Sequence, residues 1–249
     1  MAGVGRVVLW PGGSLWIARQ SGVAAPHAHH AIQLSLALRG RLAMADEFGR
    51  WCPYDGALVM PHHAHSFDGL GLDTATVFVE PETPLGRALL QRYGAQPITA
   101  LPAEAVRTLS APLRQGLEDG ASDEALVAAA RWAASWLVAT TCARCAVDAR
   151  IERSIAWLRA RLPQPVCLAQ AAARAHLSPS RFRHLFVHET GLSFRAYLLW
   201  ARVESAVGAG MAGLSWTQAA HEAGFADSAH LSRTCRRMFG IAPAMLVRG

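Results

Sequence analysis

Arginine recurs at matching positions in two segments near the C-terminal end of the chain. When the sequence is compared with itself at an offset of 49 residues, Gly191 aligns with Gly240, and Ser178 aligns with Asp227. The segments that end at these glycines, 179–190 and 228–239, carry several arginines and almost no acidic residues. A guanidinium group pairs with phosphate oxygens and with the edge of guanine. The chemistry that these residues predict is therefore binding to DNA.

Helical spacing places the polar residues of each segment on one face. Phe182 and Phe186 belong to the apolar stripe of the first segment. Leu231 and Cys235 belong to that of the second. The residues left on the outward faces are the predicted DNA-binding residues: Ser180, Arg181, Arg183, His184, His188, Ala229, His230, Ser232, Arg233, Arg236 and Arg237.

A shorter alanine-rich segment precedes each of these, so each repeat predicts two helices joined by a tight turn. The helices are expected at 168–175 and 179–190 in the first repeat, and at 217–222 and 228–239 in the second. Ser178 and Asp227 stand where a short oxygen-bearing side chain caps free N–H groups at a helix start. The arrangement is a helix-turn-helix, present twice.

Residues 194–207 are predicted to form an amphipathic helix between the repeats. At 1.5 Å per residue this helix is about 21 Å long, and Gly208, Gly210 and Gly213 are expected to end it. A rigid spacer of this order holds both recognition helices on one side of a duplex, near the roughly 34 Å of one helical turn. One chain is then able to reach two successive major grooves.

Net charge separates this region from the rest of the chain. The chain has 249 residues and a formal net charge of +6, and its 24 Lys and Arg residues are all arginine. Residues 148–249 hold 13 arginines and 6 acidic residues, whereas residues 1–147 hold 11 and 12. A cationic module of this kind attracts a polyanion, and the part joined to it is nearly neutral.

The N-terminal part shows a different pattern. Between residues 4 and 79 the apolar runs are short, and turn-forming segments such as 11–13, 39–41 and 46–49 separate them. Residues 33–38 alternate with a period of two, which is typical of a half-buried strand. Several such strands predict an antiparallel sheet that closes into a small barrel or sandwich.

Helical spacing begins near residue 85 and continues into a third helix after Ser122. In that helix Trp132 and Trp136 lie beside an apolar stripe, and together they exceed what one helix on a small barrel normally buries. The stripe consists of Leu126, Ala130, Ala133 and Leu137. We predict a homodimer through the helices at 109–145, with packing inside one chain as the alternative.

The cysteines and the apolar runs indicate the cellular compartment of the protein. Five cysteines at irregular spacing are typical of reduced thiols, and Cys142 and Cys145 lack the further ligands of a zinc site. The most apolar stretch, 132–143, falls short of the roughly 20 residues that span a bilayer. The first residues lack the apolar length of a secretory signal. These features predict a cytoplasmic protein that does not enter a membrane.

Residues 168–247 resemble the AraC/XylS family of bacterial transcription regulators. The resemblance rests on the segments 176–182, 186–191, 193–197, 224–228 and 233–243. Leu231 and Cys235 stand where the family usually has phenylalanine, and Ala242 stands where it usually has serine. The resemblance implies a transcription regulator, more often an activator, whose partners are double-stranded promoter or operator DNA and RNA polymerase.

The family also implies a sensory or oligomerising N-terminal domain that is often cupin-like. Two sets of residues resemble the first and second cupin motifs: Gly22, His27, His29, Gln33 and Gly40, and then Gly56, Pro61 and His65. The first set departs by one residue in spacing and has glutamine in place of glutamate. The resemblance brings six of the eleven histidines, at 27–30 and 62–65, face to face across a barrel mouth.

Histidines that meet in this way suit either of two ligands. A divalent transition metal such as Zn²⁺ takes His27, His29 and His65 as ligands, with Gln33 as a weak fourth. A small organic effector uses neutral imidazoles as hydrogen-bonding groups. The effector-binding residues predicted on either basis are His27, His29, Gln33, His63 and His65.

Together these features predict a multidomain α+β chain. A cupin-like antiparallel β-barrel is expected at 1–84, a helical linker and dimerisation region at 85–147, and an all-α domain with two helix-turn-helix units at 148–249. The favoured function is a DNA-binding regulator, not an enzyme, that responds to a ligand in the barrel. Two alternatives stay open: a metal-dependent cupin enzyme, and a regulator without an effector whose barrel is filled by its own side chains.

Overall fold

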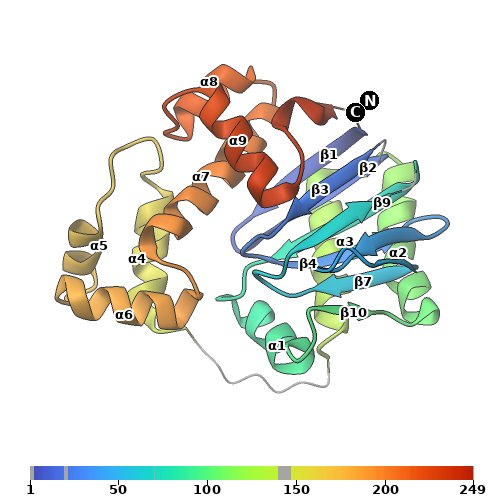
Figure 1. Ribbon diagram of the computed structural model, residues 1–249, viewed down its shortest axis with the longest axis horizontal. Coiled ribbons are helices and arrows are strands. Elements are labelled where there is room, and N and C mark those ends of the chain that lie inside the picture. Colours follow the sequence, from blue (N-terminus) through green and yellow to red (C-terminus); the bar gives the residue numbers. More distant parts are fainter. Residues whose placement is uncertain (1–2, 20–21, 70, 140–146, 249) are drawn as a thin grey trace.

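The computed structural model describes residues 3–19, 22–69, 71–139 and 147–248. A domain of β-sheets with covering helices comes first in the chain, and a module of helices follows it (Figure 1). Helix α7 (Phe194–Met211) connects the two halves of the module and lies beside the β domain.

Two sheets make up the β domain. Within the described residues, the larger sheet has seven strands in the order β10-β7-β4-β9-β2-β1-β11, and the smaller has four in the order β3-β8-β5-β6. The antiparallel sheets predicted for residues 4–79 are thereby confirmed. The strands are β1 Gly3–Trp10, β2 Gly13–Arg19, β3 Val23–His27, β4 Ile32–Ala37, β5 Leu42–Ala45, β6 Trp51–Tyr54, β7 Gly56–Val59, β8 His65–Asp68, β9 Asp73–Val79, β10 Ile98–Ala100 and β11 Leu246–Arg248.

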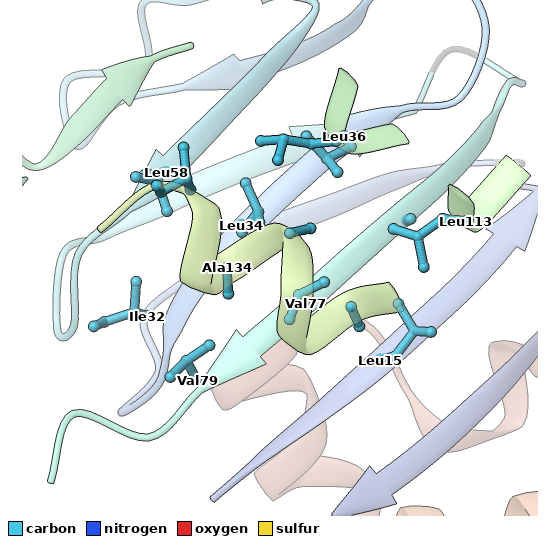
Figure 2. Close-up of a cluster of buried hydrophobic side chains, with 14 of the residues drawn as sticks. Leu15, Ile32, Leu34, Leu36, Leu58, Val77, Val79, Leu113 and Ala134 are labelled. Atoms are coloured by element: carbon cyan, nitrogen blue, oxygen red, sulfur yellow. The ribbon is translucent and has the colours of Figure 1, made fainter. Parts of the chain in front are cut away.

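Helices α2 (Ala103–Glu118) and α3 (Asp123–Trp136) cover one face of the larger sheet. Leu34 and Val77 of the sheet belong to the same buried cluster as Leu113 of α2 (Figure 2). The opposite face packs on the smaller sheet through Met44 and Phe67. Because β4 is covered on both sides, all of its residues are buried. Burial stabilises each large apolar side chain by about 1.5–3 kcal/mol relative to exposure.

The apolar stripe of α3 is buried inside the chain. Its residues, Leu126, Ala130, Ala133 and Leu137, belong to the core against the larger sheet. The prediction that this stripe forms a subunit interface is therefore wrong. The alternative, packing within one chain, is correct for these residues. Trp132 and Trp136 are each 43% exposed. The homodimer now rests on these two side chains, and it remains a prediction. Cys142 and Cys145 lie outside the described residues.

The helices predicted for the two repeats are confirmed as α5, α6, α8 and α9. The first repeat has an apolar core around Phe182 and Phe186 that includes no described residue of the β domain. The second repeat shares its core with the β domain through Ala31 and Phe78. The remaining described helices are α1 Pro84–Tyr93, α4 Ala149–Arg159, α5 Leu168–Arg174, α6 Pro179–Thr190, α8 Trp216–Glu222, α9 Ser228–Phe239 and the 3₁₀ turn Pro243–Met245.

Helix α7 is longer than the sequence predicts. It has 18 residues, so Gly208 and Gly210 lie within the helix and do not end it. A Cβ at Gly208 would lie 2.4 Å from Leu9 of β1, and one at Gly210 would lie 2.1 Å from the ring of Trp216. These glycines let β1 and α8 approach the helix closely. Glycine costs roughly 1 kcal/mol inside a helix, but any larger residue here would collide with Leu9 or Trp216.

Strands β10 and β11 are absent from the sequence-based prediction. β10 pairs with β7 at one edge of the larger sheet, and β11 pairs parallel with β1 at the other, with Gly3 opposite Leu246. Strands of three residues are too short for a periodic pattern to mark them. Both strands belong to the larger sheet although they lie outside residues 1–84. The predicted domain limits at 84 and 147 therefore remain proposals. No helix in the described part of the chain combines the length and the apolar character needed to cross a membrane.

Candidate functional site

The recognition helices α6 and α9 begin and end in the same way. Ser178 Oγ and Asp227 Oδ1 accept hydrogen bonds from backbone N–H groups three residues further on, at 3.3 and 2.6 Å. Each helix stops at a glycine in the left-handed conformation, Gly191 with φ 73° and Gly240 with φ 69°. The predicted caps are confirmed, and the recognition helices of the two repeats begin and end at equivalent positions.

Side chains predicted to contact DNA lie mostly on the surface. Nine of them are exposed: Ser180, Arg181, Arg183, His184, His188, Ala229, Arg233, Arg236 and Arg237. The other two, His230 and Ser232, are half-buried. His188 Nδ1 is also within 3.0 Å of Glu189 Oε1. The five arginines are therefore the groups most available to a duplex, and their contact with DNA stays a prediction.

Three of the predicted ligand-binding histidines meet in the β domain. His27 ends β3, His29 follows it and His65 begins β8, and all three are buried. The ring centroids of His27 and His29 lie 4.2 and 5.0 Å from that of His65. Gln33 Oε1 lies 2.8 Å from His29 Nε2 and 3.3 Å from His65 Nε2. The structure thus brings together four of the five residues predicted to bind an effector.

Burial keeps these imidazoles neutral. Desolvation, with a smaller contribution from nearby His65, lowers the pKa of His27 to about 3. The same two causes hold the pKa of His29 well below its ordinary value. Burial also lowers the pKa of His65. Neutral imidazole is the form that binds metals and accepts hydrogen bonds.

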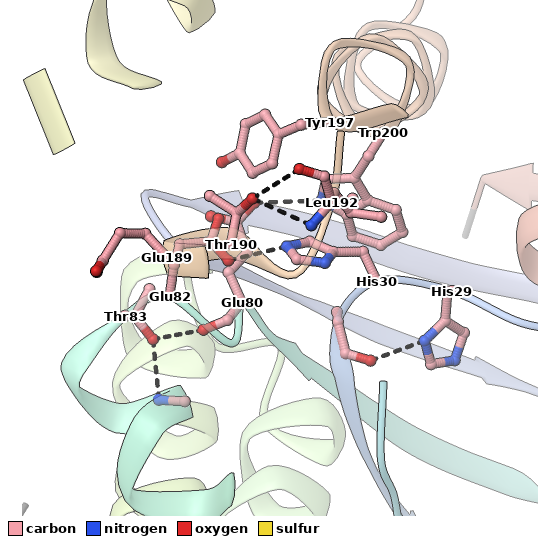
Figure 3. A network of polar contacts seen from close by, with 12 residues as sticks. His29, His30, Glu80, Glu82, Thr83, Glu189, Thr190, Leu192, Tyr197 and Trp200 are labelled. Carbon is pink, nitrogen blue, oxygen red and sulfur yellow. Dashed lines mark hydrogen bonds and ion pairs between the residues drawn. The ribbon is translucent and has the colours of Figure 1, made fainter. Parts of the chain in front are cut away.

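The remaining histidines of the two segments point elsewhere. His30 Nε2 is hydrogen-bonded to Glu82 Oε2 at 2.9 Å, and its ring lies edge-on to Trp200 of α7 (Figure 3). His63 is half-buried, and its backbone oxygen accepts a hydrogen bond from His65. The side chain of His62 is exposed. The predicted meeting of six histidines is therefore correct for three.

Buried charged groups lie between the β domain and the helical module. Glu80, which follows β9, and Glu204 of α7 both form ion pairs with Arg159 of α4, Glu204 at 3.0 Å. Trp200 Nε1 donates a hydrogen bond to Glu80 Oε1 at 3.3 Å (Figure 3). Two carboxyl groups thus share one guanidinium group. The network joins strand β9 to two helices of the module.

The shared guanidinium cannot balance two carboxylates. Burial, with the neighbouring charge of Glu80, raises the pKa of Glu204 to about 8 despite the attraction of Arg159. Burial likewise raises the pKa of Glu80. Near neutral pH the pair therefore retains a proton, and the network carries little net charge.

The end of α9 is pressed onto strand β3. Ala25 donates its backbone N–H to the Gly240 oxygen at 3.1 Å. A Cβ at Gly240 would lie 2.3 Å from the Ala25 oxygen and 2.7 Å from His27 Nδ1. The ring of Phe239 lies 4.9 Å from that of Trp16, between centroids. The second recognition helix therefore covers the histidines of the β domain.

Little space remains under this cover. A cavity of about 50 Å³ lies between His27, Gln33, Phe78 and Phe239. Small-molecule sites are typically larger than about 300 Å³, so this cavity suits an ion or water. An open cleft of about 670 Å³ is also lined by His27. An organic ligand in the smaller cavity would have to displace Phe239.

Sequence reasoning missed Glu80, Arg159, Glu204 and Phe239. Glu204 carries a signal, because it stands among the apolar positions of the helix at 194–207, where a charged group needs a partner. The other three carry none. Their positions depend on how the helical module docks on the β domain, which local periodicity does not encode.

The comparison with family models concerns the C-terminal module. Residues 171–249 match the family model of a helix-turn-helix domain. The chain is 34% identical over 100 residues to an uncharacterized HTH-type transcriptional regulator, YidL, of Escherichia coli strain K12, covering 40% of this chain and 34% of that protein. It is 32% identical over 103 residues to the HTH-type transcriptional activator RhaS of Klebsiella pneumoniae strain 342, covering 41% and 37%. The chain thus spans about a third of the length of these relatives.

Comparisons with solved structures extend over both parts of the chain. The crystal structure of ToxT from Vibrio cholerae O395 has a TM-score of 0.61 at 12% identity and covers 95% of this chain and 99% of that one. ToxT from V. cholerae strain SCE256 with a bound unsaturated fatty acid has a TM-score of 0.58 at 10% identity, covering 98% and 95%. The predicted fold class, with an antiparallel β domain and a helix-turn-helix module, is confirmed. So is the resemblance of the module to the AraC family.

The two cap glycines test how tightly α9 docks. Gly191→Ala should cost about 1–2 kcal/mol of unfolding free energy, because alanine is strained at positive φ. Gly240→Ala should cost about 1–3 kcal/mol more, because its Cβ also meets the backbone of β3. Urea unfolding of both variants measures the difference. Equal losses would contradict the docked position of α9.

Glu204 predicts a pH dependence of stability. Its pKa of about 8 lies above the ordinary value of 4.5, so its contribution to stability is fully present below pH 4.5 and is lost as the pH rises through 8. Glu204→Gln should therefore show a flatter fall of the thermal midpoint between pH 5 and about 8.5 than the unmodified chain. Glu222→Gln, at an exposed position of α8, is the control. Parallel curves for all three proteins would rule out this role of Glu204.

Proposed function

We propose that this chain, whose C-terminal module is an AraC-type helix-turn-helix domain, is a sequence-specific DNA-binding transcription regulator and not an enzyme. The observation that carries the proposal is the duplicated recognition helix with its outward arginines. Arg181 and Arg183 on α6, and Arg233, Arg236 and Arg237 on α9, are all exposed. Arginine pairs with guanine in the major groove and with phosphates along the backbone.

Both helices reach DNA together because α7 joins the two repeats. With 18 residues, α7 is about 27 Å long. Successive major grooves on one side of a duplex are roughly 34 Å apart. A single chain therefore reads a site with two unlike halves, one under each recognition helix. Such a regulator acts where the chromosome is, which places it in the cytoplasm, and RNA polymerase is the partner through which it changes transcription.

Control by a ligand is the second part of the proposal. The second repeat shares its core with the β domain, whereas the first has a core of its own. A ligand that favours one docked position of α9 would change the placement of one recognition helix relative to the other. The fatty acid bound to ToxT, a protein with this fold, supports effector control here.

The outward arginines give the direct test of DNA binding. Duplexes that the full chain selects from a random pool supply the site. Arg183→Ala and Arg233→Ala should each weaken binding by about 1–3 kcal/mol and relax the preference at one base pair. Arg237→Ala should weaken all sequences alike and reduce the salt dependence. Fluorescence anisotropy at several salt concentrations measures both effects.

Arg107→Ala, at an exposed position of α2, is the matched control and should leave the affinity unchanged. If the full chain selects no sequence from the pool, the proposed function is wrong. If all three test variants lose affinity without any change in sequence preference, the base-contacting residues of α6 and α9 have been wrongly assigned.

A further inference from the structure

The histidine cluster of the β domain has the composition of a metal site. His27, His29 and His65 each offer one ring nitrogen, and these nitrogens lie within 4.8 Å of one another. Ligands held 2.0–2.1 Å from a tetrahedral zinc ion are roughly 3.3 Å apart. To bind such an ion, the three rings would have to turn so that the nitrogens close to that separation.

Hydrogen bonds behind the rings set which nitrogen is free. Nδ1 of each ring lies close to a backbone oxygen two residues away: Ala25 at 2.8 Å, Ala31 at 2.8 Å and His63 at 3.0 Å. A carbonyl oxygen only accepts, so Nδ1 carries the hydrogen in all three rings. The lone pair of each neutral imidazole is then on Nε2. Metal-bound histidines are oriented in this way by partners on the other ring nitrogen.

Gln33 completes the set of donor atoms. Its Oε1 lies 2.8 Å from His29 Nε2 and 3.3 Å from His65 Nε2, while its Nε2 donates to Ser35 Oγ at 2.9 Å. In this arrangement an amide oxygen faces two ring nitrogens that also carry lone pairs. Acceptors at this distance repel one another, and a cation bound between them would relieve the repulsion at both nitrogens at once. Three imidazole nitrogens and one amide oxygen match the ligand preference of zinc-like divalent ions.

We propose that His27, His29 and His65 bind one divalent transition-metal ion through Nε2, with the Gln33 oxygen as fourth ligand. The ion belongs to the class of Zn²⁺, Co²⁺ and Ni²⁺, for which imidazole is a suitable ligand. A cavity of about 50 Å³, lined by His27 and Gln33 but not by His29 or His65, lies beside the proposed site. The open cleft of about 670 Å³ is also lined by His27, so this ligand is the one nearest to open solvent space.

Metal binding at this site acts on the second recognition helix. His27 Nδ1 lies under Gly240, and Ala25, two residues before His27, is hydrogen-bonded to Gly240. Drawing His27 toward an ion therefore moves the strand segment that holds the end of α9. This part rests on the proposed function, since it makes the metal the ligand through which the β domain controls DNA binding.

Metal titration tests the site itself. The tag-free full chain, freed of metal with a chelator and desalted, is titrated with Co²⁺ and then with Zn²⁺. One equivalent of Co²⁺ should give visible absorption bands that Zn²⁺ abolishes. His65→Ala should weaken binding by at least about 100-fold, because losing even a partner behind a ligand costs 10- to 100-fold.

Two further variants keep this test decisive. His27→Gln retains a polar side chain of similar size, and its circular dichroism shows whether it is folded, so loss of metal from a folded protein supports the site. His221→Ala removes an exposed histidine of α8 and should bind metal like the unmodified chain. If His65→Ala and His27→Gln bind Co²⁺ as tightly as His221→Ala, the metal site is wrong.

DNA affinity with and without metal tests the regulatory part. The chelated full chain, with and without one equivalent of Zn²⁺, is measured against the selected duplex. We expect at least about a 5-fold change in affinity, the lower end of usual allosteric coupling, and no change in His27→Gln. Equal affinities at a filled site would overturn the regulatory role alone. Absence of DNA binding in both states would overturn the proposed function, while the Co²⁺ titration still decides the site.

Discussion

The contact between Gly240 and strand β3 fixes the arrangement of the whole molecule. At this point the backbone of the second recognition helix meets the backbone of the β domain with no space for a side chain. Phe239, one residue earlier, packs between Trp16, Phe78 and Trp200. The first repeat has a separate apolar core. The second recognition helix is therefore held directly against the β domain, whereas the first is joined to it through α7 and the Arg87–Glu189 ion pair.

The buried ion network adds a second connection of a different kind. Arg159 and its two carboxyl partners join β9 to α4 and α7, and Arg87 of α1 holds Glu189 at the end of α6 at 2.5 Å. Moving a charged group out of water costs several kcal/mol per ion. The attraction between oppositely charged partners offsets this cost only when each ion pair is complete. Such a network stabilises one docked arrangement and penalises partial separation. It suits a chain with two distinct arrangements more than one that deforms gradually.

Local signals account for what the sequence predicts correctly. The limits of α6 and α9 follow from a capping oxygen at one end and a glycine at the other, both visible in the sequence. The grouping of His27, His29, Gln33 and His65 follows from the cupin resemblance. The errors concern packing between distant segments: the glycines of α7 receive Leu9 and Trp216, and the stripe of α3 covers the larger sheet. Strand β11 and the ion network depend on the docking of two domains, for which no periodic pattern exists.

Chemical footprinting of the full chain on its selected duplex tests most directly whether both recognition helices occupy one DNA molecule. The account predicts two protected patches per chain on one side of the duplex, centred about 10 base pairs apart, the repeat of B-DNA. At saturating protein, Arg183→Ala should weaken protection mainly in one patch, and Arg233→Ala mainly in the other. A single protected patch, or equal weakening of both patches by either substitution, would contradict it.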